Sequence, residues 1–130
     1  MQKILVDSGP LIALFDRDEE HHDSVVSCIK KNDHYSMATT WPVLTETSHL
    51  LDFDLNAQLD CLTWIDKSNI EIIQHSSLDL QHMIEYMSKY QDRPMDLADA
   101  SLVLSAIQLE TQLIITLDKD FLIYRLPHKK

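Results

Sequence analysis

The sequence predicts a single α/β domain in which a central parallel sheet is covered by helices on both faces. A length of 130 residues allows one domain with its own core and is short for two. Short apolar runs typical of buried strands alternate with longer segments of helical spacing. One Gly and four Pro leave no flexible linker, so the whole chain is expected to form one unit, apart from a flexible tail at about 126–130. Alternating strands and helices favour a parallel sheet.

The N-terminal part is expected to form two strand–helix pairs with a further helix between them. A strand over residues 3–6 leads through an acid and a Ser-Gly-Pro turn into a helix LIALF. A helix over about 20–31 precedes a strand over 35–38. The helix that follows, within TTWPVLTETSHLL, has Thr40 as its N-cap and a Pro in its first turn.

The middle of the chain is expected to contain two more helices around a strand. A helix over about 56–67 precedes the β-branched run 70–74, which suits a central strand. Ser77 is expected to cap a helix that continues to about residue 90, before Arg93 and Pro94 interrupt it. The expected apolar face of that helix consists of Leu78, Met83, Ile84 and Met87.

The C-terminal part begins with a long helix over 95–109 and continues with a strand over 112–116. The run FLIYRLP offers a short edge strand at the end. The long helix is expected to bury Leu97, Ala98, Leu102, Ile107 and Leu109.

Charge and composition exclude several classes of protein. The net charge of −10 argues against a simple electrostatic nucleic-acid-binding module, so any nucleic-acid chemistry must be local and assisted by a cation. No apolar run approaches the ~18 residues of a membrane helix, and no signal peptide is recognisable, which predicts a cytoplasmic protein with no membrane partner. Cys28 and Cys61 are expected in the core, and Trp41 and Trp64 in the core or a dimer interface rather than as base-stacking platforms.

Four acids are expected to converge at one edge of the predicted sheet. Asp7 directly follows the first strand and Asp118 follows a later strand by one residue, and parallel sheets place their binding crevice beyond these strand ends. Glu46 stands in the helix after the second strand. Asp99 lies one turn into the long helix between two alanines, which allow close approach of other backbone.

Clustered carboxylates repel one another, and a divalent cation offsets that repulsion. Oxygen ligands suit Mg²⁺ or Mn²⁺, which can activate a water for attack on a phosphodiester. Asp96 and Asp120 are further candidate ligands, although Asp96 also suits a helix cap and Asp120 a polar turn. The hydroxyls of Ser8 and Thr116 either orient a ligand or serve only as cap and strand residues.

The segments VDSGPLIAL, TETSHLL, MDLADASLV and ITLDKDF, in this order, resemble the PIN-domain ribonucleases of the VapC toxin type. The resemblance extends from Ile4 to Phe121 and matches the family's acids to Asp7, Glu46, Asp99 and Asp118. It implies a PIN-like fold, Mg²⁺- or Mn²⁺-dependent cleavage of RNA, a homodimer and a cognate antitoxin. The chain differs at Gly9, where members often carry Asn, and at Asp96, where they often carry a neutral residue.

A non-enzymatic alternative remains, namely a PIN-like module that keeps its acids but acts only as a binding partner in a protein or RNA complex. A response-regulator receiver would require paired acids after the first strand and a late Lys, and a haloacid-dehalogenase-like phosphatase would require an acid at position 9. DSGP and LDKDF match neither pattern.

Overall fold

The computed structural model describes residues 2–89, 95–117 and 122–125. Its strands and helices alternate along the chain as the sequence predicts, with boundaries that differ by a few residues. The elements, in order, are β1 (Lys3–Val6), α1 (Ser8–Phe15), α2 (His22–Lys31), β2 (Ser36–Thr40), α3 (Trp41–Leu50), α4 (Leu55–Lys67), β3 (Glu71–Ile73), the 3-10 turn η1 (Ser77–Asp79), α5 (Leu80–Lys89), α6 (Leu97–Gln108), β4 (Leu113–Thr116) and β5 (Leu122–Arg125).

The strands form one sheet in the order β3-β2-β1-β4-β5. The first four strands are parallel, and β5 pairs antiparallel with β4. The predicted parallel sheet is therefore confirmed for four strands, and the predicted edge strand near the C-terminal end is confirmed as β5. The predicted tail at 126–130 and the break at Arg93 and Pro94 lie outside the described residues.

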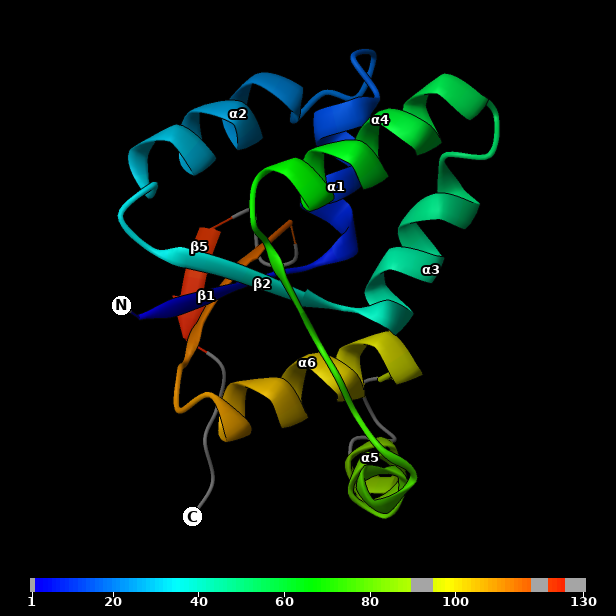
Figure 1. The fold of residues 1–130 in the computed structure, drawn as a ribbon, viewed down its shortest axis with the longest axis vertical. Coiled ribbons are helices and arrows are strands. Elements are labelled where there is room, and N and C mark those ends of the chain that lie inside the picture. Colours follow the sequence, from blue (N-terminus) through cyan, green and yellow to red (C-terminus); the bar gives the residue numbers. More distant parts are fainter. Residues whose placement is uncertain (1, 90–94, 118–121, 126–130) are drawn as a thin grey trace.

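Helices cover the sheet on both faces, as predicted (Figure 1). Helices α1, α2 and α4 lie on one side of the sheet, and α5 and α6 lie on the other. Helix α3 contacts both α1 and α6, so it joins the two helical layers beside the carboxyl ends of β1 and β2. The core between the layers is built from strand residues such as Ile4, Leu5 and Ile115, all without exposed surface. Among the described helices, none has the length and apolar content needed to cross a bilayer.

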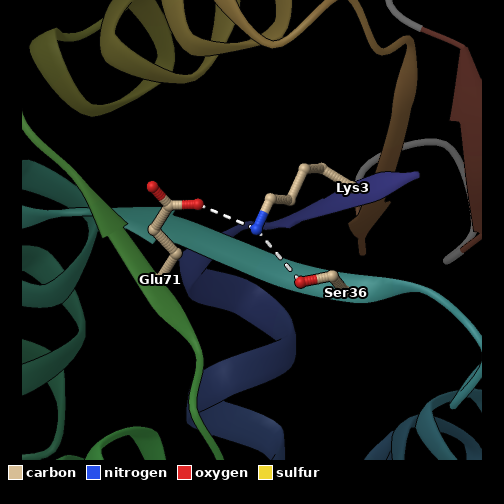
Figure 2. A network of polar contacts seen from close by, with 3 residues as sticks. All are labelled: Lys3, Ser36 and Glu71. Carbon is tan, nitrogen blue, oxygen red and sulfur yellow. Dashed lines mark hydrogen bonds and ion pairs between the residues drawn. The ribbon is translucent and has the colours of Figure 1, made fainter. Parts of the chain in front are cut away.

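The prediction of a central strand over 70–74 is wrong, because β3 is an edge strand of three residues. Its exposed Glu71 forms an ion pair of 2.8 Å with Lys3 of β1. Lys3 also donates a hydrogen bond of 3.1 Å to Ser36, and Figure 2 shows this network spanning β1, β2 and β3. A β-branched run indicates a strand but not its position in the sheet, which depends on pairing with distant segments.

The apolar face predicted for residues 77–90 is largely exposed. Ser76, rather than Ser77, provides the cap, and the segment begins with η1 before α5. Met83 packs against Ala100 and Leu104 of α6. Of the four predicted residues Met83 is buried, whereas the other three are exposed: Leu78, Ile84 and Met87.

Helix α6 is the most buried of the helices, yet two of its predicted core residues are exposed. Ala98 and Leu102 are buried as expected, whereas Leu97 and Ile107 expose 45% and 43% of their surface. Only one side of α6 can face the sheet, and that side carries Ala98 and Leu102. Leu97 and Ile107 are apolar too, but they lie on other sides of the helix and stay exposed.

Candidate active site

Asp7 is held at the carboxyl end of β1 by contacts from two directions. Its Oδ1 accepts a hydrogen bond of 2.7 Å from the backbone N–H of Ser8, and Asp7 is the N-cap residue of α1. Its Oδ2 accepts a hydrogen bond of 3.1 Å from Thr116 Oγ1, at the carboxyl end of β4. The side chain of Thr116 is buried, so this contact fixes one carboxylate oxygen with little freedom.

Glu46 is linked to Asp7 through Ser8. Ser8 Oγ donates a hydrogen bond of 3.0 Å to Glu46 Oε1, while the backbone N–H of the same residue contacts Asp7. Ser8 and Thr116 therefore both form hydrogen bonds with acids of the candidate site, and their role in orienting metal ligands stays a prediction. The sequence alone left helix capping and strand propensity as alternative explanations for these two hydroxyls.

Helix α3, which carries Glu46, is anchored by a buried hydrogen bond. Thr40 caps α3, as predicted, and accepts a hydrogen bond of 3.3 Å from Val43 N–H. Its hydroxyl also lies 2.7 Å from Ser101 Oγ of α6, and both side chains are fully buried. This pair joins the two helices that carry Glu46 and Asp99, and sequence reasoning identified only the cap.

Asp99 and Asp96 form a capping box at the start of α6. Asp96 Oδ1 accepts a hydrogen bond of 2.8 Å from Asp99 N–H, and Asp99 Oδ2 accepts one of 3.3 Å from Asp96 N–H. The predicted cap role of Asp96 is therefore confirmed. Its second predicted role, as an outer metal ligand, stays a prediction.

The carboxyl group of Asp99 also has a raised pKa. Burial, and after it the carboxylates of Asp96 and Asp7, together raise the pKa of Asp99 to about 7. Because the charge of Asp7 contributes to the raised pKa of Asp99, the two carboxylates lie within electrostatic reach of each other. Asp7 follows β1, and Asp99 lies in the first turn of α6. Two neighbouring carboxylates in a half-buried place form a site that a cation would stabilise.

The convergence of four acids is shown only in part. Within residues 2–89, 95–117 and 122–125, no three His, Cys, Asp or Glu side chains gather closely enough to hold a metal by themselves. Asp118 and Asp120 lie outside the described residues. The oxygen donors that are present nevertheless fit Mg²⁺, since this ion usually binds through one or two carboxylates and completes its shell with water and substrate phosphates.

Gly9 permits close packing beside these acids. A Cβ atom added at Gly9 would lie 3.3 Å from Leu117 Cβ and from Leu117 Cγ. Leu117 directly follows β4, so the missing side chain lets α1 approach the end of that strand. This close approach gives a structural reason for Gly at position 9, where PIN-domain ribonucleases of the VapC type often carry Asn.

Comparison with known proteins yields a family match and two similar proteins. A family model described as "PIN domain" matches residues 4–127. Ribonuclease VapC26 of Mycobacterium tuberculosis is 26% identical over 118 residues, which cover 89% of this chain and 87% of that protein. The crystal structure of M. tuberculosis VapC20, a toxin that cleaves the sarcin-ricin loop, has a similar fold. It matches with a TM-score of 0.77 and 21% identity, and the match covers 95% of this chain and 99% of VapC20.

Proposed function

This chain belongs to the PIN-domain family, and on that premise we propose that it is an endoribonuclease of the VapC toxin type. The observation that carries the proposal is the pair Asp7 and Asp99 at the carboxyl ends of the sheet, with the pKa of Asp99 raised to about 7. An acid with this pKa beside a second carboxylate is typical of a functional site. The name of VapC26 as a ribonuclease supports the same activity.

We infer that the cofactor is Mg²⁺ or Mn²⁺. Asp7 and Asp99 would hold the ion, with Glu46 completing or extending the site, and Asp118 is proposed as a further ligand from the segment after β4. Asp96 and Asp120 are proposed as additional outer ligands. When bound, such an ion activates water and stabilises the charge that develops at the phosphate.

The surrounding residues then act by positioning these carboxylates. Ser8 N–H and Thr116 Oγ1 each hold one oxygen of Asp7, and Ser8 Oγ orients Glu46. The capping box fixes the first turn of α6 and with it Asp99. Because the pKa of Asp99 is about 7, cation binding near neutral pH would release a proton from this group.

The acidity of the protein is consistent with a cation-assisted reaction. A net charge of −10 repels an RNA backbone, and the repulsion is strongest where carboxylates gather. A bound divalent ion would offset much of this negative charge at the place where the scissile phosphate must approach. RNA binding is therefore expected to require the cation.

The proposed partners are an RNA substrate, a second copy of this chain and a cognate antitoxin, all in the cytoplasm. VapC20 and VapC26 carry names that describe a toxin and a ribonuclease, which supports an antitoxin for this chain as well. The structure offers apolar surface for protein partners. On α4, Leu55, Leu59 and Leu62 share one helix face at spacings of four and three residues, and each exposes at least 41% of its surface.

The test of the proposed function is RNA cleavage by purified protein with Mg²⁺, Mn²⁺ or EDTA, on a panel of structured RNAs. Asp99→Asn should abolish cleavage in Mg²⁺ because it removes a metal-binding oxygen, and wild type should be inactive in EDTA. Asp66→Asn, on the exposed face of α4, makes the same change in charge away from the site and should leave cleavage unchanged. No cleavage by a folded wild type that binds Mn²⁺ would favour the alternative of a catalytically silent binding module.

A further inference from the structure

A pocket of about 350 Å³ opens beside the sheet beyond the end of β3. Its walls come from the start of α3, the segment after β3, the start and middle of α5, and the first turn of α6. This volume lies near the lower end of the roughly 300–1,000 Å³ found for small-molecule pockets. The size suits one small, flat group rather than a long segment of chain.

The rim of this pocket consists of unusually exposed apolar side chains. Trp41, the first residue of α3, exposes 51% of its surface, so it does not lie in the core, and its other predicted place, a dimer interface, stays a prediction. Leu80 and Leu97 expose 51% and 45%, and both line the same pocket. An exposed Trp beside a hollow is a platform on which an aromatic ligand gains both apolar burial and stacking.

The polar part of the lining is neutral. Within the described part of the chain, no Asp, Glu, Lys or Arg lines the pocket, although the net charge of the protein is −10. The polar side chains are those of Gln74, His75, Ser76 and Ser77. Without a charged side chain, the lining does not suit a phosphate or a metal ion, and it favours an uncharged ligand with polar edges.

The hydrogen bonds of His75 define what it offers to a ligand. Ser105 Oγ lies 2.8 Å from the carbonyl of Ser101 and 3.1 Å from His75 Nε2. We infer that its single hydrogen is donated to the carbonyl and that it accepts the hydrogen of Nε2. This tautomer makes Nδ1 the acceptor of the ring. Burial lowers the pKa of His75, against an opposite effect of Asp79, so the ring is neutral at pH 7. A neutral acceptor next to an amide and two hydroxyls matches the mixed edge of a nucleobase.

The pocket and the acids share two structural elements. Trp41 and Glu46 are both on α3, and Leu97 and Asp99 are both in the first turn of α6. β3 is two strands away from β1, which corresponds to roughly 10 Å at an inter-strand spacing of about 4.8 Å. A base in the pocket and a phosphate at the acids would therefore belong to the same or neighbouring nucleotides.

We propose that this pocket binds one unpaired nucleobase of the RNA, packed against Trp41, next to the bond that the acids cleave. The proposal rests on the proposed ribonuclease function and adds a specificity site to it. Proteins that read single-stranded or looped RNA commonly hold splayed-out bases against aromatic side chains in this way. The preferred RNA would then carry an unpaired base beside the cleaved bond.

The test uses uncharged nucleosides as probes, because they contain no phosphodiester and need no metal. Adenosine, guanosine, cytidine and uridine are titrated in EDTA, and the indole N–H resonance of Trp41 and the amide resonances of residues 74–77 are followed by NMR. At least one nucleoside should shift these resonances at millimolar concentration. Trp41→Ala should abolish the shifts at residues 74–77, and Trp41→Phe should retain them.

The matched control is Phe53→Ala. Phe53 exposes 64% of its surface just beyond the far end of α3, a helix of ten residues and thus about 15 Å long. This variant should bind nucleosides like wild type. In RNA cleavage, Trp41→Ala should raise KM about tenfold, within the range that one base–aromatic stack contributes, whereas Phe53→Ala should not.

The outcomes separate this proposal from the ribonuclease assignment. Nucleoside binding without RNA cleavage would support the pocket and contradict the proposed function. Asp99-dependent cleavage with no nucleoside-induced shift and an unchanged KM in Trp41→Ala would overturn the pocket proposal alone. Conversion of a dimer into a monomer by Trp41→Ala, together with no nucleoside binding by wild type, would show that a second copy covers the pocket and would also overturn it.

Discussion

Replacement of Asp99 by Asn should stabilise the metal-free protein at neutral and alkaline pH. The pKa of Asp99 is raised from 3.8 to about 7 in the folded state, chiefly by burial and then by Asp96. An acid with a raised folded pKa contributes most to stability below its unfolded pKa, and this contribution is lost as the pH rises through about 7. Wild type in EDTA should therefore lose stability between about pH 4 and pH 7, relative to Asp99→Asn.

The size of this stability difference follows from the pKa shift of Asp99, reduced for screening by solvent. A shift of about three units corresponds to about 4 kcal/mol at about 1.36 kcal/mol per unit. Because Asp99 is only half-buried, solvent screening reduces the expected difference above pH 7 to roughly 1–2 kcal/mol. Loss of the negative charge near the N-terminus of α6 subtracts about 0.3–1 kcal/mol, which is smaller than the gain.

Urea denaturation at several pH values, with EDTA or with millimolar Mg²⁺, measures this difference. In EDTA, the stability difference between Asp99→Asn and wild type should grow from pH 4 to pH 8, whereas Asp66→Asn should follow wild type. Mg²⁺ should stabilise wild type and have little effect on Asp99→Asn, because binding to the folded state alone raises its stability. Parallel pH profiles in EDTA, or equal stabilisation of both proteins by Mg²⁺, would refute the reasoning.

Three further substitutions test the scaffold of the site. Thr116→Val removes the hydroxyl that donates a hydrogen bond to Asp7 Oδ2. The cleavage rate should fall about tenfold, since hydrogen bonds to charged groups contribute about 1.5–3 kcal/mol. An unchanged kcat in a folded variant would contradict this role of Thr116. Thr40→Val removes both the buried hydrogen bond to Ser101 and the oxygen that caps Val43 N–H, and it should lower the free energy of unfolding by about 1–3 kcal/mol in urea titrations. An unchanged free energy of unfolding would exclude a structural role. Gly9→Ala should change the free energy of unfolding by less than about 1 kcal/mol, because the higher helix propensity of Ala offsets its tight contact with Leu117. The rate of RNA cleavage should nonetheless fall. A rate equal to that of wild type would show that the Leu117 side chain moves aside freely.

The local features of this protein were predictable from short stretches of sequence. The caps Thr40 and Asp96 depend on groups three residues away, and both appear as predicted. The strand before Asp7 and the strand that ends at Thr116 were recognisable from their apolar runs, because a buried parallel strand needs apolar residues on both faces. Parallel topology brings the ends of these strands together, and there Thr116 Oγ1 donates its hydrogen bond to Asp7 Oδ2, a pairing that the sequence did not specify.

What the sequence by itself determined is therefore the order of elements, their caps and the acids that follow the strands. Only the tertiary structure decided that β3 lies at an edge, that the apolar face of α5 is mostly exposed, and that Trp41 borders a pocket instead of the core. It also decided that Asp99 comes within electrostatic reach of Asp7. Caps and periodicity act over a few residues, whereas strand position, helix exposure and pKa arise from contacts between segments distant in sequence, whose energies no local pattern contains.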